Sequence, residues 1–350
     1  MSQSSLKVLV LFDLSIPLKP EEYDDYIKTD DWKSEANILN TLKKMGHEPK
    51  LLGIHDDIGP LLKEVKLNRP DVIFNLSEAF KGDRYFEPHM ASLLDLLDIP
   101  FTGAKPESLH ICKDKGLSKK ILTYHRIDVP RFLISRKSSP LRSLQNLKLP
   151  VFIKPLDLEA SEGISQLSFA ENTKDALDRV KYLHEKYETN VIIEEYIEGR
   201  ELYVGVIGNE KLTTFPAREL HFREVPDGEP KFASFKAKWD DEYRKKWGIK
   251  TGSAQLTEEM QIKLDELCKR IYRALGLSGY ARIDLRLTPS GNFVCIEANP
   301  NPSIERESDF ALSTLKSGMT YEEMVQKILN LAFTPVDDSA QGRSTRKKKK

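Results

Sequence analysis

Three oxygen-bearing residues on a predicted β-hairpin, with an arginine beside them, have the types and spacing needed to hold a divalent metal ion. The segment GYARIDLRLTPSGNFVCIEANPNPS contains two alternating stretches joined at a Pro-Ser-Gly turn, which is typical of paired antiparallel strands. Alternation puts Arg282 and Asp284 on one face of the first strand, and Glu297 and Asn299 on one face of the second. If the two faces coincide, Asp284, Glu297 and Asn299 provide the oxygen ligands that Mg²⁺ on a nucleoside triphosphate requires. An exposed polar face with incidental salt bridges is the alternative; the stiff Asn-Pro-Asn-Pro exit favours the metal site.

A second pair of acidic residues flanks a turn. In EEYIEGRE, Glu194 and Glu201 lie seven residues apart around Gly199, one at the end of a predicted strand and the other at the start of the next. Two such carboxylates could hold the hydroxyls of a ribose or the edge of an adenine. Taken alone, the pattern fits a salt-bridged turn better.

A lysine at a strand end is followed by a loop of small residues. Lys154 comes after the apolar run VFI and before Pro155, so its ammonium group could contact a phosphate as a compact point charge. The next residues, LEASEGIS, include Ser161 and Gly163, and the backbone amides of such a loop can close over phosphates. An ordinary turn is the alternative for this loop.

The apolar pattern predicts a small α/β lobe followed by a mixed α+β body. LKVLVLFDLS, PKLLGI and PDVIFNL read as strands separated by helical patterns, which is the signature of a parallel sheet. Short strands are expected from residue 131 onward, around a helix over residues 173–187. The segment TEEMQIKLDELCKRIYRALGL predicts an amphipathic helix, and a last helix is expected over residues 321–332. The predicted units are 1–113, 114–190, 191–335 and a disordered basic tail over 336–350.

Composition limits the class of protein. The chain has 350 residues, 54 Lys and Arg, 54 Asp and Glu, and a net charge of zero, so no global field favours nucleic acid or a membrane as a partner. No apolar stretch approaches the ~20 residues that span a bilayer, and the start lacks the pattern of a signal peptide. Three scattered cysteines argue against a disulfide framework. We therefore expect a cytoplasmic protein, with a solvated lysine tail favoured over a weak contact with nucleic acid.

Eight motifs in sequence order resemble those of D-alanine–D-alanine ligase and its ATP-grasp relatives. They are NLSEAFKGDRYFE, IPFTGAKPESLHICKDKGLSKKIL, FIKPLDLEASEGI, IIEEYIEGRE, FPARELHF, FKAKW, GYARIDLR and IEANPNPS, and the likeness runs from about residue 74 to 332. The resemblance implies an N-terminal parallel α/β lobe followed by a two-lobed ATP-grasp fold, with ATP and Mg²⁺ (or Mn²⁺) between the lobes. It also implies small amino-acid substrates and a homodimer formed through the first lobe.

The resemblance assigns a role to each matching residue. The residues implied to bind ATP are Lys115 and Lys154 on the phosphates, Glu194 and Glu201 on the adenine amino group and ribose, and Glu195 to Ile197 as the adenine hinge. The implied metal ligands are Asp284, Glu297 and Asn299, in agreement with the hairpin argument.

Five more residues have implied roles in catalysis or substrate binding. Arg282 matches the arginine that steadies the acyl phosphate, and Ser161 matches the serine of the phosphate-covering loop. Lys238 and Trp239 fall where a substrate-closing loop carries a lysine and an aromatic residue. Ser308 matches a hydroxyl that binds the carboxylate of the second amino acid.

The N-terminal segment departs from the family pattern. The family opens with a glycine-rich strand exit and a glutamate for the ammonium group of the first substrate, whereas this chain reads LFDLSIPLKPEEYDDYI. Asp13, Glu21 or Glu22 could replace that acid, and Ser303 stands where a glycine is usual. The expected reaction joins a carboxylate to an amine through an acyl phosphate. The open alternatives are D-alanyl-D-alanine synthesis, a ligase of other amino acids or a peptide, and a nucleotide-binding protein without catalysis.

Overall fold

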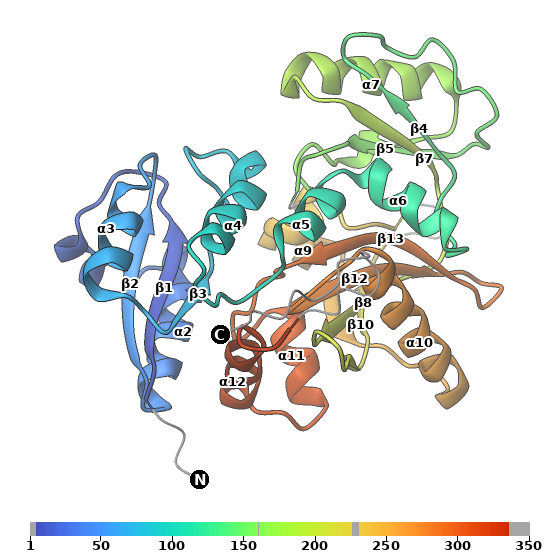
Figure 1. Cartoon of the computed structure of the whole chain (residues 1–350). Coiled ribbons are helices and arrows are strands. Elements are labelled where there is room, and N and C mark those ends of the chain that lie inside the picture. Colours follow the sequence, from blue (N-terminus) through green and yellow to red (C-terminus); the bar gives the residue numbers. More distant parts are fainter. Residues whose placement is uncertain (1–4, 160, 226–230, 336–350) are drawn as a thin grey trace.

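Three lobes surround a central region in the computed structural model, which describes residues 5–159, 161–225 and 231–335 (Figure 1). The side chains at positions 24, 238 and 239 lie outside this description. No helix in the described part of the chain is both long and apolar enough to cross a membrane.

The first lobe is built on a parallel sheet in the order β2-β1-β3. Its strands are β1 (Lys7–Asp13), β2 (Glu48–Ile54) and β3 (Val72–Asn75). The run from Val8 to Phe12 is buried on both faces, because α2 (Lys33–Lys44) covers one side and α3 (Gly59–Asn68) and α4 (Glu87–Leu96) cover the other. This arrangement explains why the sequence of β1 is continuously apolar. A short helix, α1 (Tyr23–Tyr26), lies in the long segment between β1 and α2.

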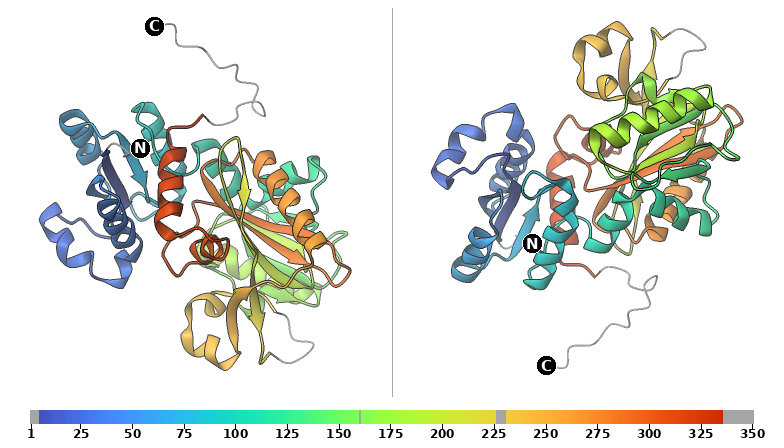
Figure 2. Two further views of the ribbon diagram at one scale, coloured as in Figure 1. Left: turned by 90° about the horizontal axis from the view of Figure 1, so that it is seen from below. Right: turned by 90° about the horizontal axis from the view of Figure 1, so that it is seen from above.

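The small lobe is a four-stranded antiparallel sheet in the order β4-β7-β5-β6. Its strands are β4 (Phe132–Ser135), β5 (Val151–Pro155), β6 (Phe169–Ala170) and β7 (Val191–Glu195). Helix α7 (Thr173–Tyr187) lies on the outer face of the sheet, away from the large lobe (Figures 1 and 2). The apolar residues of β5 and β7 alternate toward α7, so the intervening side chains face the large lobe.

The large lobe is an antiparallel sheet in the order β11-β10-β8-β12-β13, with β9 paired to β8. Its strands are β8 (Arg200–Ile207), β9 (Thr213–Thr214), β10 (Arg218–Phe222), β11 (Ile249–Ser253), β12 (Tyr280–Leu287) and β13 (Phe293–Pro300). Helices α10 (Glu258–Ala274) and α6 (Lys115–Tyr124) pack on its apolar face. The remaining helices are α5 (Pro106–Lys113), α8 (Phe235–Trp239), α9 (Asp241–Lys246), α11 (Asp309–Lys316) and α12 (Tyr321–Leu331).

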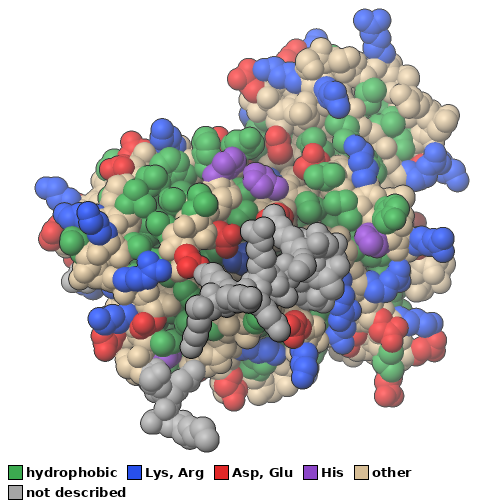
Figure 3. Space-filling view, viewed as in Figure 1, with side chains coloured by type: hydrophobic (Ala, Val, Ile, Leu, Met, Phe, Trp, Pro, Cys, Tyr) green, Lys and Arg blue, Asp and Glu red, His purple; other side chains and the backbone are tan. Residues whose placement is uncertain are grey.

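The first and large lobes share a hydrophobic core. Helices α11 and α12 place Phe310, Met324 and Ile328 against Val10 and Phe74 of the first lobe. This core fixes the β1 end of the first lobe beside the segment that leaves β13. Acidic and basic side chains alternate over the face seen in Figure 3.

The fold class is confirmed, and two lobe boundaries differ from the prediction. Strand β7 belongs to the small sheet, so this sheet ends at Glu195 and not at residue 190. Helix α6 was assigned to the small lobe, but Leu122 is buried in the core of the large lobe. The helical pattern of α6 cannot show which sheet its apolar face meets. The predicted tail over 336–350 lies outside the described residues.

Candidate ATP and metal site

A cleft between the small and large sheets gathers most of the predicted site residues. Its lining includes Lys154 of β5, Glu194 and Glu195 of β7, and Asp284 and Glu297 of the β12–β13 hairpin. The other predicted residues that line the cleft are Ser161, Ile197 and Glu201. The two sheets thus bring together residues that are up to 143 positions apart, from 154 to 297.

The hairpin places the predicted metal ligands on one face. Asp284 pairs directly with Glu297, and Arg282 pairs directly with Asn299. Directly opposed residues of antiparallel strands project to the same side, so the four side chains are neighbours. A shift in register after Asp284 ends this arrangement, because Leu285 then faces Cys295.

The chemistry of the trio fits a hard divalent cation. Asp284 and Glu297 supply carboxylates, and Asn299 supplies a carboxamide; all three can bind through oxygen. The side-chain amide nitrogen of Asn299 is buried and has no hydrogen-bond partner within the described part of the chain. No hydrogen bond from this nitrogen therefore fixes the carboxamide in its present orientation. Asn299 adds a carboxamide oxygen beside the two carboxylates; among the described residues, no group of three His, Cys, Asp or Glu side chains is arranged to hold a metal.

Two cations border the trio. Arg282 donates two hydrogen bonds to Asp284, from Nε at 2.7 Å and from Nη2 at 2.9 Å. Lys115 is the first residue of α6; its Nζ lies 3.4 Å from Oε1 of Glu297 and donates a 2.6 Å hydrogen bond to the carbonyl of Leu158. Lys115 therefore reaches both the hairpin and the loop after β5.

Glu194 forms a buried triad with two lysines. Its carboxylate lies 3.2 Å from Nζ of Lys119 and 3.3 Å from Nζ of Lys154, and all three residues are at most 4% exposed. Burial opposes ionisation of Glu194, but the two ammonium groups outweigh it and hold its pKa below the usual range. Sequence reasoning missed Lys119, although it follows Lys115 by one helical turn and therefore lies on the same face of α6.

The opposite end of the cleft is formed where β7 continues into β8. Glu201 accepts hydrogen bonds from Nη2 of Arg286 at 2.8 Å and from the hydroxyl of Tyr203 at 2.9 Å, which fix one edge of the cleft. Glu195 accepts from the backbone N–H of Lys148 at 2.8 Å, so its side chain anchors the hinge. Gly199 permits the tight connection: its φ is +142°, and an added Cβ would lie 2.1 Å from the carbonyl oxygen of Leu287.

The loop after β5 closes over the cleft. Ser161 donates a hydrogen bond from Oγ to the carbonyl of Ala233 at 3.1 Å, and the N–H of Phe235 donates to the carbonyl of Ile164 at 3.2 Å. The predicted closing residues Lys238 and Trp239 fall on α8, but their side chains lie outside the described structure.

Ser308 is not brought into the cleft. Its hydroxyl caps α11 by accepting a hydrogen bond from the N–H of Ala311, and it is not among the residues that line the ATP cleft or the cavity described next. The predicted contact with a substrate carboxylate therefore stays a prediction.

A separate cavity of about 580 Å³ lies between the first lobe and the segment after β13. Five carboxylates line it, together with Ser303, and none of the residues that line it is Lys or Arg: Asp13, Asp31, Glu35, Glu78 and Glu305. Glu21 and Glu22 are exposed and do not line it, so Asp13 is the one predicted replacement acid that does.

Glu35 is the most perturbed acid of this cavity. Its Oε2 atom is buried and has no hydrogen-bond partner within the described residues. Burial, with smaller effects from the charges of Asp13, Glu78 and Glu305, raises its pKa to about 7. A glutamate in the first turn of a helix is ordinary, so no sequence pattern marks this residue.

Comparisons with known proteins agree with this geometry. A model of the family described as D-ala D-ala ligase C-terminus matches residues 112–330. The chain is 28% identical over 307 residues to a D-alanine–D-alanine ligase of Haemophilus influenzae (strain PittEE), covering 86% of this chain and 96% of the relative. It is also 28% identical over 303 residues to an uncharacterized protein, y4sG, of Sinorhizobium fredii, covering 85% and 86%.

Two solved structures share the fold. The D-alanine–D-alanine ligase of Bacillus anthracis complexed with ATP aligns with a TM-score of 0.72 at 20% identity, covering 94% of this chain and 98% of that chain. The VanG D-Ala:D-Ser ligase of Enterococcus faecalis aligns with a TM-score of 0.68 at 18% identity, covering 94% and 100%.

Proposed function

Because the chain belongs to the D-ala D-ala ligase C-terminus family, with an ATP-grasp fold, we propose that it is an ATP- and Mg²⁺-dependent ligase forming a C–N bond. The observation that carries this proposal is the direct pairing of Asp284 with Glu297, and of Arg282 with Asn299, on a hairpin whose Asp284 and Glu297 line the same cleft as Lys154. Asp284, Glu297 and Asn299 would hold the metal ion, which neutralises phosphate charge when bound. Mn²⁺ fits the same ligands.

The reaction has two steps. A substrate carboxylate oxygen attacks the terminal phosphorus of ATP, the bond to ADP breaks, and an acyl phosphate forms. The nitrogen of an amine then attacks the carbonyl carbon, the bond to phosphate breaks, and the amine loses its proton as phosphate leaves. Lys115 and Lys154 hold the phosphates, and Arg282 stabilises the oxyanion from a fixed position on Asp284.

The remaining predicted residues bind or enclose the substrates. Glu201 and the Glu195–Ile197 hinge hold the ribose and adenine. Ser161, Lys238 and Trp239 close the site, and Ser308 receives the second substrate. Glu194 orients Lys154, because both of its oxygens are already engaged by lysines.

D-Alanyl-D-alanine synthesis for cell-wall precursors is the first candidate activity. The cavity of about 580 Å³ favours a second candidate, a ligase of the same fold that joins other amino acids or a peptide. One carboxylate is enough to bind a single ammonium group, whereas five line this cavity. Glu78 is paired with Arg84 at 2.8 Å, and burial raises the pKa of Glu35 to about 7, so the excess charge comes from Asp13, Asp31 and Glu305. A first substrate with a further ammonium group on its side chain would match the excess charge.

An ADP-release assay with a panel of amino acids tests the proposal. The panel contains D- and L-alanine, D-serine and D- and L-lysine, singly and in pairs, with Mg²⁺ or with a chelator. Metal-dependent ADP release with any pair supports a ligase, and the preferred pair separates the two candidates. ATP binding without ADP release from any pair would favour a nucleotide-binding protein without catalysis.

The cytoplasm and a homodimer formed through the first lobe complete the proposal. Both rest on the family relationship. Light scattering on the purified chain distinguishes a dimer of about 80 kDa from the 40.1 kDa monomer.

A further inference from the structure

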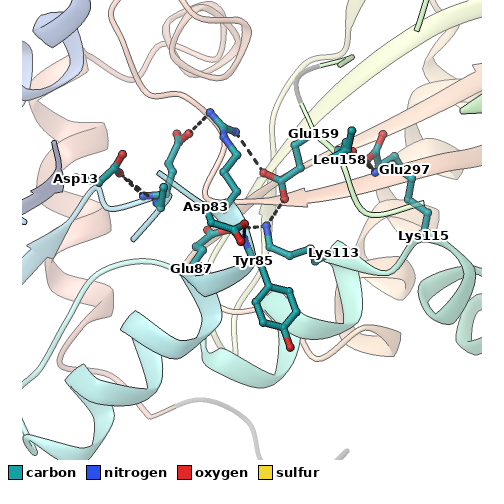
Figure 4. Close-up of polar contacts among 12 residues, drawn as sticks. Asp13, Asp83, Tyr85, Glu87, Lys113, Lys115, Leu158, Glu159 and Glu297 are labelled. Carbon is teal, nitrogen blue, oxygen red and sulfur yellow. Dashed lines mark hydrogen bonds and ion pairs between the residues drawn. The ribbon is translucent and has the colours of Figure 1, made fainter. Parts of the chain in front are cut away.

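A chain of alternating charges connects the first lobe to the loop after β5. Arg84 lies between two carboxylates: its Nη2 is 2.8 Å from Glu78, and its Nη1 is 3.3 Å from Glu159. Lys113 also lies between two carboxylates, with Nζ 2.7 Å from Glu159 and 3.3 Å from Glu87 (Figure 4). Glu159 is thus held by two cations that come from different segments.

The charged residues of this network come from separate segments of the first lobe and the small lobe. Glu78 and Arg84 belong to the segment between β3 and α4, and Glu87 is the first residue of α4. Lys113 is the last residue of α5, and Glu159 lies in the loop between β5 and β6. The ion pairs therefore join the first lobe to the small lobe.

The ion pairs that Lys113 makes with Glu87 and Glu159 are partly shielded from solvent. The side chains of Lys113 and Glu87 are 9% and 10% exposed, and that of Glu159 is 30% exposed. Burial opposes the charge of Lys113, but Glu159 and Glu87 outweigh it and hold the pKa of Lys113 above its usual range. Ion pairs in this setting are screened less by salt than pairs on an open surface.

The loop has a second anchor at the neighbouring residue. The carbonyl of Leu158 accepts a 2.6 Å hydrogen bond from Lys115, which in turn contacts Glu297 of the metal hairpin. Glu159, one residue later, is held from the first lobe. Leu158 and Glu159 are therefore held from two sides, close in sequence to Ser161, which contacts Ala233 across the cleft.

The other end of the charge chain is also fixed. The backbone N–H of Glu78 donates a 2.6 Å hydrogen bond to Asp13 at the end of β1, and the N–H of Ala79 donates to the same oxygen at 3.3 Å. Tyr85 is held by Asp83 in the same segment (Figure 4). The segment that carries Arg84 is thus attached to the first sheet and does not move independently of it.

We propose that Arg84, Lys113 and Glu159 are positioning residues that fasten the phosphate-covering loop to the first lobe and so tighten the binding of the nucleotide. The proposal rests on the proposed function, since it takes the cleft to bind ATP. The loop needs to be held because ordering a free loop around a ligand costs conformational entropy at the moment of binding. A loop that is already fastened binds the phosphates without that cost.

A double-mutant cycle on the full chain tests the proposal. We expect Arg84→Gln and Glu159→Gln each to raise the Kd for the non-hydrolysable analogue AMPPNP with Mg²⁺ by about 10-fold, which corresponds to about 1.4 kcal/mol. Because Arg84 reaches the loop through Glu159, which Lys113 also holds, the double variant should weaken binding by about 10-fold, as Glu159→Gln alone does, and not by about 100-fold. Glu162→Gln is the matched control: it removes the same charge from an exposed position of the same loop, and should change Kd by less than about twofold.

Hydrogen exchange separates positioning from a general loss of stability. We expect Glu159→Gln to speed exchange in residues 156–165 and not in α7 or α10, whereas a destabilised fold would speed all of them. Single variants that bind AMPPNP within twofold of the wild type, or a double variant whose effects multiply, would overturn the fastening role. A wild-type chain that does not bind AMPPNP would instead overturn the proposed function, and the fastening role with it.

Discussion

Lys119→Met should be among the most destabilising single substitutions in the ATP cleft. The side chain of Lys119 is 1% exposed and ties three elements together: its ammonium group on α6 contacts Glu194 of β7 at 3.2 Å and donates to the carbonyl of Ile296 on β13 at 2.5 Å. Methionine keeps the flexible apolar stem but removes the charge, so the substitution creates little cavity. The substitution leaves the buried carboxylate of Glu194 beside one cation, Lys154, where the wild type has two.

The expected loss follows from the burial of the pair. Removing one partner of a buried ion pair costs about 3–5 kcal/mol, and we expect about 3 kcal/mol because Lys154 still lies 3.3 Å from Glu194. The free energy of unfolding, measured by urea titration, gives the value. Lys174→Met is the control: Lys174 is 82% exposed, pairs with Asp178 one helical turn away, and should cost less than about 0.5 kcal/mol.

A triple variant distinguishes a lost charge from lost packing. In Lys119→Met/Glu194→Gln/Lys154→Met no charge of the buried triad remains, so none is left without its partner, and more than half of the lost stability should return. The reasoning would be refuted if Lys119→Met and Lys174→Met cost the same, or if the triple variant were no more stable than Lys119→Met.

Three other expectations concern turnover, pH and the metal. Arg282→Ala should keep nucleotide binding but slow ADP release by about 10²–10³-fold, the cost of a lost oxyanion donor; unchanged product formation would contradict that role. Because the pKa of Glu35 is raised from 4.5 to about 7 in the folded state, the folded protein binds a proton more tightly than the unfolded chain, and stability falls as pH rises from about 4.5 to about 7. This fall in the free energy of unfolding is at most about 3 kcal/mol, at ~1.4 kcal/mol per pH unit. Glu35→Gln should lack this contribution, which unfolding curves measured at pH 4.5 and pH 7 would show. Chelating the divalent metal should weaken AMPPNP binding by more than tenfold in calorimetry; unchanged affinity would argue against the hairpin metal site.

Local patterns predicted the elements that carry their own periodicity. The strands at β1, β2 and β3, the helix over residues 173–187 and the β12–β13 hairpin are all present, because each buries a face that its sequence marks as apolar. Alternation put Asp284 and Glu297 each on the polar face of its strand, and the register, which alternation left open, pairs them directly. Strands β10 and β11 were missed. Strand β11 lies at the edge of the sheet and β10 is its inner neighbour, and both mix polar and apolar residues.

What the sequence could not predict depends on packing between lobes. Lys119 is an ordinary helical lysine in the sequence and becomes a structural cation only because β7 and β13 meet above α6. Glu159 lies within the FIKPLDLEASEGI motif, but that pattern does not indicate its two cations, which come from residues 46 and 75 positions earlier. Such contacts are decided by the relative placement of three lobes, which no single-sequence periodicity encodes.

The balance of charges in the cleft explains why a metal ion is needed there. Five carboxylates line it, Glu194, Glu195, Glu201, Asp284 and Glu297. Six cations line it or pair with those carboxylates, Lys115, Lys119, Arg131, Lys154, Arg282 and Arg286. Six minus five leaves a balance of only +1, and most of the positive charge is already neutralised by close partners. A triphosphate is strongly anionic, so these side chains alone cannot compensate for the loss of its hydration. On the proposed function, a divalent ion held by the hairpin would supply the missing positive charge at the phosphates, with its acidic ligands beside the lysines and not in place of them.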